Sequence, residues 1–132
     1  MELVSLCLLI VKDYVINAFT ENINDQSQEA GGIIYNVTIK VEASIAGSWL
    51  QWLLEEHIPD VMATGCFSTY KVVRLLEVDE SEGPTYAVQY NADAKALYNR
   101  YITKFSEALR QKTYDKWGQR FIAFRSVMQV VK

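Results

Sequence analysis

The sequence predicts an α+β fold in which a four-stranded antiparallel sheet carries two helices on one face, in the chain order βαββαβ. The first observation is that segments of two-residue and of three- to four-residue hydrophobic periodicity follow one another in that order between Ile33 and Val131. The second is that 132 residues, 50% of them hydrophobic, suffice for the core of a single domain. The third is a charged turn, DESEGP, which separates two strand-like segments as the turn of a hairpin does.

The first strand and the first helix are predicted from the segment that begins at Ile33. The residues of IIYNVTIKV alternate between apolar and polar after the first two, which is the period of a half-buried strand. Ser44 is a suitable N-cap for a helix that runs to about His57. The apolar stripe of this helix comprises Ile45, Trp49, Trp52 and Leu53. Pro59 cannot continue the hydrogen bonding, so we expect a break there, one further turn and an exit through Gly65.

The second half of the chain supplies a hairpin, a helix and a last strand. CFSTYKVVRLLEV, from Cys66 to Val78, is rich in β-branched and aromatic residues, and TYAVQYN is its return strand. Asp93 can cap the second helix, and Gly118 ends it. The apolar face of this helix contains Leu97, Tyr101, Phe105 and Leu109. QRFIAFRSVMQVV then forms the fourth strand, so residues 33–132 have the order of a ferredoxin-like fold.

The first 32 residues are predicted to be an N-terminal extension and linker. Leu3 to Val11 is an apolar run, but it is much shorter than the ~20 residues that a membrane-spanning helix needs. ENINDQSQEAGG is polar, rich in turn-forming residues and closed by a glycine pair, which is typical of a linker. The extension holds five of the 16 acidic residues and one of the 13 basic residues. The domain itself is therefore close to neutral, and no membrane association is expected.

The charge and the cysteines exclude several classes of protein. A net charge of −3 and an isoelectric point near 5.1 leave no basic surface for DNA or RNA, so no nucleic-acid partner is expected. Cys7 and Cys66 lie in unrelated segments without a CxxC motif, which argues against a disulfide framework or a zinc site. These features indicate a reducing, cytoplasmic environment.

The second and fourth strands carry apolar side chains on both faces. In the last strand Ile122, Phe124 and Met128 alternate with Phe121 and Val127. Two helices cover only one face of a sheet, so we expect the other face to pack on a second subunit or on the N-terminal extension. Dimerisation of two sheets would enclose a shared cleft, and a homodimer is the assembly that we expect.

The segment from Ile33 to Val131 resembles a known family of domains. The resemblance is carried by IIYNVTIKVE, WLQWLLEEHIPDVMATGCF, YKV, YAVQY and RFIAFRSVMQV, and it covers about three quarters of the chain. It is a small bacterial family of unknown function, in the superfamily of dimeric α+β barrels. The resemblance implies a ferredoxin-like, dimeric fold and no catalytic motif. The wider superfamily includes monooxygenases, muconolactone-isomerase-like enzymes, heme-degrading proteins and ligand-sensing regulators.

The stretch EEHIPDVMATGCF holds the single histidine of the chain. His57 is a candidate general base, because an imidazole titrates near neutrality and a carboxylate can orient it. The neighbouring carboxylates are Glu55, Glu56 and Asp60. The alternative, which we prefer, is a structural histidine at a helix C-terminus, where its partial positive charge meets exposed carbonyls. No metal is expected, since only carboxylates or Cys66 can join a single histidine, and Cys66 is expected to be a small buried hydrophobe.

The alternation of the strands predicts a second candidate site, on the sheet face away from the helices. The polar side chains expected to bind a small polar or anionic ligand there are Asn36, Thr38, Tyr70, Arg74, Gln89 and Arg125. The alternative is that these groups form hydrogen bonds and salt bridges in a dimer interface and enclose no ligand.

Two functions stay open at this point. The first is a dimeric domain that binds a small molecule or has a structural role. The second is a cofactor-independent monooxygenase or isomerase that uses His57 or a tyrosine of the cleft. No sequence motif indicates a cofactor for either.

Overall fold

The computed structural model of the chain describes residues 32–132, so the expected extension and linker fall outside the described residues except for Gly32. The strands are β1 (Ile33–Val41), β2 (Thr69–Arg74), β3 (Thr85–Ala92) and β4 (Phe121–Gln129). The helical elements are η1 (Ala43–Ile45), α3 (Ala46–Trp52), η2 (Leu53–His57), α4 (Ile58–Met62), α5 (Lys95–Lys104) and α6 (Ser106–Trp117). This order confirms the predicted βαββαβ, ferredoxin-like fold.

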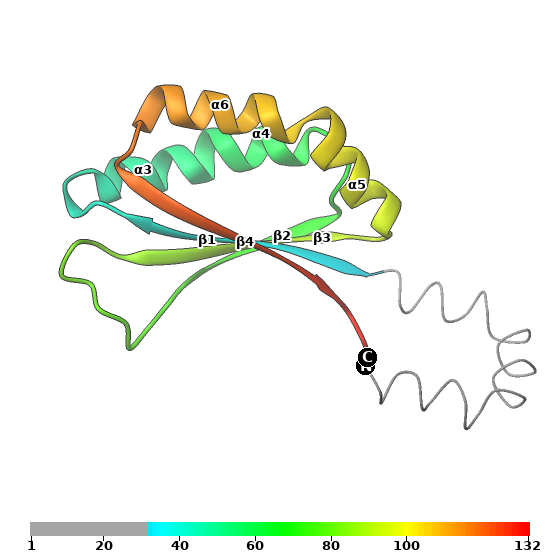
Figure 1. The fold of residues 1–132 in the computed structure, drawn as a ribbon, viewed down its shortest axis with the longest axis horizontal. Helices are drawn as coiled ribbons and strands as arrows, with labels where there is room; N and C mark the ends of the chain where they lie inside the picture. Colours follow the sequence, from blue (N-terminus) through cyan, green and yellow to red (C-terminus); the bar gives the residue numbers. More distant parts are fainter. Residues whose placement is uncertain (1–31) are drawn as a thin grey trace, which may run out of the picture.

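The described strands form one antiparallel sheet in the order β2-β3-β1-β4, with β1 and β3 in the centre. The helices lie together on one side of this sheet (Figure 1). Tyr35, Val37 and Ile39 of β1 face that side, and Asn36 and Thr38, which alternate with them, point to the opposite, open face. The predicted alternation of the first strand is therefore confirmed.

The first helical segment differs from the prediction at both ends. Ser44 does not cap it: its hydroxyl donates a hydrogen bond to the Glu42 carboxylate at 2.6 Å. Pro59 does not break it either, because the chain stays helical as far as Met62. The preceding turn, η2, is a π-helix in which the N–H of Ile58 bonds to the carbonyl of Leu53. This wider turn leads directly into α4, where proline occupies a first-turn position that requires no N–H donor.

The second helical segment is bent where the sequence predicts one continuous helix. The backbone leaves helical geometry at Phe105, with φ −125°. Ser106 hydrogen-bonds the carbonyl of Ile102 at 2.9 Å, a back-bond that often accompanies bending. Asp93 makes no cap and instead accepts a hydrogen bond from Ser68, whereas Gly118, with φ +60°, ends the helix as predicted. Across residues 32–132, no helix has both the length and the apolar character that crossing a membrane requires.

Aromatic rings fill the core between the helices and the sheet. Tyr35, at the centre of the sheet, lies 6.0 Å from the ring of Phe67 and 5.7 Å from that of Tyr101, measured between centroids. Trp49 stacks on Tyr86 at 5.8 Å. Contacts of this kind add to the stabilisation that the buried apolar area supplies. Cys66 is fully buried beside Phe67, as expected for a small hydrophobe.

The open face of the sheet exposes apolar side chains, most of them on the edge strand β4. Phe124 is 66% exposed and Ile122 is 58% exposed. Both point away from the helices because they pair with Thr38 and Lys40 of β1. The predicted apolar character of this face is therefore present in the structure, and the described residues leave it uncovered.

Candidate functional site

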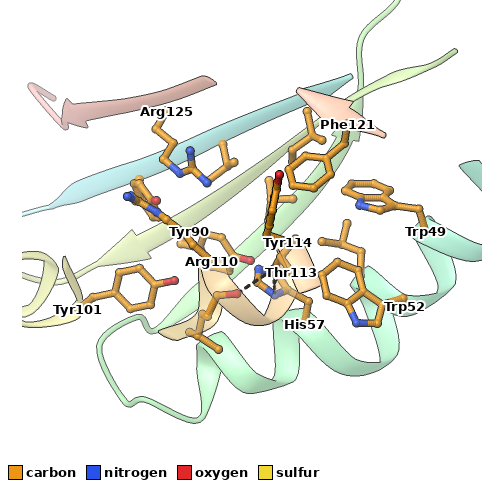
Figure 2. A pocket seen from close by; sticks show the side chains of 16 residues that line it. Trp49, Trp52, His57, Tyr90, Tyr101, Arg110, Thr113, Tyr114, Phe121 and Arg125 are labelled. Atoms are coloured by element: carbon orange, nitrogen blue, oxygen red, sulfur yellow. Dashed lines mark hydrogen bonds between the residues drawn. The ribbon is translucent and has the colours of Figure 1, made fainter. Parts of the chain in front are cut away.

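A cavity of about 240 Å³ lies between the helices and the sheet. Its floor is formed by β1, β3 and β4, and its walls by α3, η2, α5 and α6 (Figure 2). Val37 and Val88, which are directly opposite each other, occupy the centre of the floor. Short side chains at this point leave room beneath the larger aromatic rings of the walls, which include Trp49, Trp52 and Tyr101.

His57 lies in the wall of this cavity and is not at a helix end. The π-turn η2 presents it at the junction with α4, and its ring stacks on Trp52 with centroids 4.9 Å apart. Burial lowers the pKa of His57 to about 4, and Lys112 and Arg125 act in the same direction while Asp60 opposes them. The preferred structural interpretation, a charged histidine at a helix C-terminus, is therefore wrong: the imidazole is neutral at pH 7, and the helix continues beyond it.

Thr113 of α6 favours the tautomer of His57 in which Nδ1 carries the proton. Its hydroxyl donates to the carbonyl of Leu109 at 2.9 Å, so its oxygen is left to accept from Nδ1–H of His57. That contact is 3.5 Å long and therefore weak. A neutral imidazole with its proton on Nδ1 keeps a free lone pair on Nε2, and such a group can accept a hydrogen bond or a proton.

Polar groups with few partners surround the cavity. Arg110 and Arg125 line it from α6 and β4. Burial raises the pKa of Tyr101, and both arginines oppose this rise, so their positive charges act on the same phenol. The pKa of Tyr90 is raised by burial as well, so both phenols are neutral and can donate a hydrogen bond into the cavity.

Two tryptophans of the cavity wall have unsatisfied donors. Trp49 is 2% exposed and Trp52 is 7% exposed, and neither indole N–H has a hydrogen-bond partner among residues 32–132. The indole of Trp117, which does not line the cavity, shares this state. A buried donor without a partner costs about 1–3 kcal/mol, and an acceptor that reaches it removes that cost.

The six residues predicted to form a site on the open face lie on two different faces of the sheet. Asn36, Thr38 and Gln89 do point to that face: Asn36 pairs with Gln89, and its amide donates to the hydroxyl of Thr38 at 3.0 Å. None of these three residues lines the cavity.

The predicted orientation of Tyr70, Arg74 and Arg125 is wrong. Tyr70 is opposite Tyr90, and Arg74 is opposite Tyr86, so both project to the helix side of the sheet. Arg125 projects to the same side because it is opposite Val37. Arg74 is bound to Glu80 at 2.9 Å, and only Arg125 of these three residues lines the cavity.

Several residues that line the cavity lie on a helix and cannot be predicted from the alternation of the strands. Arg110, Thr113 and Tyr114 lie on successive turns of α6 and face the sheet with Leu109. Their spacing of three and four residues, next to the apolar stripe of the helix, is the sequence pattern that indicates a shared face. Within the described part of the chain, no group of three or more His, Cys, Asp or Glu side chains lies close enough to hold a metal ion.

Solved structures of low sequence identity share this fold. A dimeric ferredoxin-like protein from an uncultured marine organism has a TM-score of 0.57 and 9% identity, and the match covers 77% of this chain and 97% of that chain. A mutant of SnoaB, a cofactor-independent oxygenase from Streptomyces nogalater, has a TM-score of 0.58 and 8% identity, with coverage of 78% and 96%. An EthD-like protein from Ralstonia eutropha has a TM-score of 0.53 and 16% identity, with coverage of 77% and 94%. At such identities the likeness concerns the fold alone.

A family model matches the chain in sequence. The family is described as Domain of unknown function (DUF4286), and the matched residues, 32–131, contain every helix and strand of the described structure. No functionally curated protein shows significant sequence similarity to the chain. The match confirms the resemblance inferred from IIYNVTIKVE and the segments after it, and the chain belongs to the DUF4286 family of domains of unknown function.

Proposed function

We propose that the chain binds a small organic molecule with a polar or anionic group, in the cavity between the helices and the sheet. One observation carries the proposal: an apolar cavity of about 240 Å³ is surrounded by polar groups that lack partners within the described domain. Ligand sites usually combine apolar walls with a few convergent polar groups, and drug-sized ligands occupy ~300–1,000 Å³. The smaller volume favours a compact ligand of one or two rings. The proposed site is on the helix side of the sheet, and the site predicted on the open face is replaced by it.

The indole N–H groups provide a direct test. The chain has three tryptophans, so an ¹H–¹⁵N spectrum contains three indole signals. We expect the neutral probe 2-naphthamide to shift the signals of Trp49 and Trp52, which line the cavity, more than that of Trp117, which does not. Val37→Phe fills the floor of the cavity and should abolish these shifts while the rest of the spectrum stays dispersed. Equal shifts in wild type and Val37→Phe would contradict the proposal.

We also propose that the domain forms a homodimer through the open face of the sheet. The support is the exposed apolar surface of β4, since patches of this kind on proteins usually mark contact surfaces. One structural neighbour is itself described as a dimeric ferredoxin-like protein. In such a dimer Asn36, Thr38 and Gln89 would contribute hydrogen bonds across the interface.

Proton abstraction from a bound carbon acid is the second candidate function. It is favoured by the neutral His57, which lines the cavity and whose imidazole has one unprotonated nitrogen. Hydrogen–deuterium exchange at the α-carbon of 2-tetralone, followed by NMR in D₂O, measures such an abstraction without a known substrate. Faster exchange with wild type than with His57→Phe supports the enzyme, whereas equal rates leave only binding.

We also propose limits for the folded domain and a cellular location for the chain. Residues 33–132 contain the whole βαββαβ order, so we assign the folding unit to them and treat residues 1–32 as an extension. A cytoplasmic location accords with Cys66, which is a free, fully buried thiol.

A further inference from the structure

Two arginines from consecutive elements of the chain line the same cavity. Arg110 is on α6, in the helical layer, and Arg125 is on β4, at the edge of the sheet. Arg125 reaches the cavity because its position opposite Val37 directs the side chain toward the helices. Figure 2 shows both arginines toward the same side of the cavity as Tyr101. Their charges also act on a common group, since each of them opposes the rise that burial causes in the pKa of Tyr101.

Neither arginine has a carboxylate partner within residues 32–132. The ion pairs there engage Lys40, Arg74, Lys112 and Arg120. Two carboxylates of the helical segment that contains His57 are already paired, because Lys112 contacts Asp60 at 2.7 Å and Glu56 at 3.9 Å. Two like charges at one cavity, without a counter-ion from the described domain, create a positive potential at that end.

The opposite end of the cavity has a different character. Trp49 and Trp52 lie there, toward the other side of the view in Figure 2. Their rings supply an apolar surface, and their buried N–H groups lack acceptors within the described domain. A ligand that suits both ends is therefore a flat apolar molecule. It carries an anionic group at the arginine end and can carry a weak hydrogen-bond acceptor at the tryptophan end.

The anion that fits this arrangement is a carboxylate. The planar fork of a guanidinium matches the two oxygens of a carboxylate, and Tyr101 adds a hydroxyl donor beside it. Arginine also binds phosphate bidentately, but a phosphate presents three terminal oxygens, and phosphate sites often add backbone N–H groups at a helix N-terminus. The arginine end of this cavity is instead built from side chains in the body of α6 and β4.

We infer that Arg110 and Arg125 form a carboxylate-binding pair, and that the ligand of the cavity is a small aromatic monocarboxylate whose ring lies against Trp49 and Trp52. This inference rests on the proposed function, because it assigns a chemical class to the ligand of the same cavity.

Isothermal titration of the full chain with three naphthalene probes tests the inference. The probes are 2-naphthoate, the neutral 2-naphthamide and 2-naphthyl phosphate. We expect 2-naphthoate to bind about 10- to 100-fold more tightly than 2-naphthamide, as hydrogen bonds to charged groups allow. The phosphate should bind less tightly than the carboxylate. Tighter binding of the phosphate would overturn the assignment of a carboxylate.

Arginine variants locate the effect. Arg110→Met and Arg125→Met keep the bulk of the side chain and remove its charge, so each should reduce the affinity for 2-naphthoate about 10-fold or more and leave that for 2-naphthamide unchanged. Arg100→Met is the matched control: it removes the same charge from an exposed residue that packs over Phe105 and does not line the cavity. It should leave both affinities unchanged.

The outcomes distinguish a failure of the arginine pair from a failure of the proposed ligand site. Equal affinity for 2-naphthoate and 2-naphthamide, with the tryptophan signals shifted, would leave the cavity a ligand site and overturn the arginine pair. A loss of 2-naphthoate affinity in Arg100→Met as large as in Arg125→Met would do the same, because it would indicate a long-range charge effect. Binding of neither probe would overturn both statements. Circular dichroism of each variant shows whether a loss of binding comes from a loss of fold.

Discussion

Val37 and Arg125 lie directly opposite each other on the antiparallel strands β1 and β4. Opposite residues of a sheet share a face, so the guanidinium of Arg125 leaves the sheet on the side that Val37 presents to the helices. A charged side chain thereby enters the layer that otherwise holds the aromatic core. Because β4 is an edge strand and Arg125 is exposed, the charge stays partly hydrated at the mouth of the cavity and does not carry the full cost of burial.

The first prediction concerns the pH dependence of stability. The pKa of His57 is about 4 in the folded chain against 6.5 for the free group, so the unfolded chain binds the proton first. The contribution of neutral His57 to the free energy of unfolding is fully present above pH 6.5, and it is lost as the pH is lowered toward 4. The loss from this residue approaches ~3 kcal/mol at most, since one pKa unit corresponds to ~1.4 kcal/mol and His57 is only partly buried.

Urea unfolding of wild type and His57→Phe between pH 7 and pH 4 measures this effect. Phenylalanine keeps the stacking on Trp52 and has no titrating group, so the variant should lose less stability than wild type over this range. The groups that face His57 are Asp60 on α4, Lys112 on α6 and Arg125 on β4, and the variant retains all of them. Parallel pH profiles of the two proteins would show that His57 is not held neutral by burial.

The second prediction concerns the loop between β2 and β3. Gly83 has φ +148°, and a Cβ at this position would overlap the carbonyl oxygen of Val41 and lie 2.8 Å from the nitrogen of Ala43. Gly83→Ala should therefore destabilise the domain by about 2–4 kcal/mol, from backbone strain and overpacking together.

Gly47→Ala is the control for that substitution. Gly47 lies in α3, and no atom beyond its chain neighbours and the backbone of its own helix would come within 4 Å of an added Cβ. Alanine should raise the free energy of unfolding there by about 0.5–1 kcal/mol, because glycine is a poor helix former. Chemical denaturation of both variants checks the pair of values. Equal effects of the two substitutions would mean that the loop relaxes around Gly83.

The order of elements could be predicted because local patterns determine it. The alternation in IIYNVTIKV, the stripe of Trp49 and Trp52, and the stop at Gly118 all appear in the structure. The π-turn before Pro59 could not be predicted, since a one-residue shift in hydrogen bonding leaves the apolar stripe nearly unchanged. Proline alone therefore suggested a break where the helix in fact continues.

The site was harder to predict than the fold. The last strand is apolar on both faces, so its sequence does not reveal which face meets the helices, and Arg125 was placed on the wrong one. The sequence of β2 poses the same difficulty for Tyr70 and Arg74. The convergence of Arg110 with Arg125 depends on how the helical layer docks on the sheet, which no local pattern encodes.

The third prediction concerns the limits of the domain. A fragment of residues 33–132 should fold and dimerise, because every described strand and helix lies within it. It loses the hydrogen bond from the Val130 N–H to the Gly32 carbonyl, so a change of about 1 kcal/mol in stability is expected. Circular dichroism and light scattering of the fragment check both expectations. A fragment that fails to fold would assign part of residues 1–32 to the folding unit.

The fourth prediction concerns the interface of the proposed homodimer. Phe124 is 66% exposed on the open face of the sheet, opposite Thr38. In a symmetric dimer Phe124→Asp removes two apolar contacts of ~1.5–3 kcal/mol each and adds two charges, so dissociation should become easier by about 100-fold or more. Sedimentation velocity over a range of concentrations should show a dimer for wild type and a monomer for the variant.

Leu54→Asp is the matched control for Phe124→Asp. Leu54 is 45% exposed, lies on the helical side of the molecule and receives the same charge in this substitution. It should leave the dimer intact, because the proposed interface is the opposite face of the sheet. If Leu54→Asp dissociates the dimer and Phe124→Asp does not, the subunits meet through their helices. If wild type itself sediments as a monomer at all concentrations, the exposed apolar side chains of β4 require another partner, since patches of this kind usually mark contact surfaces.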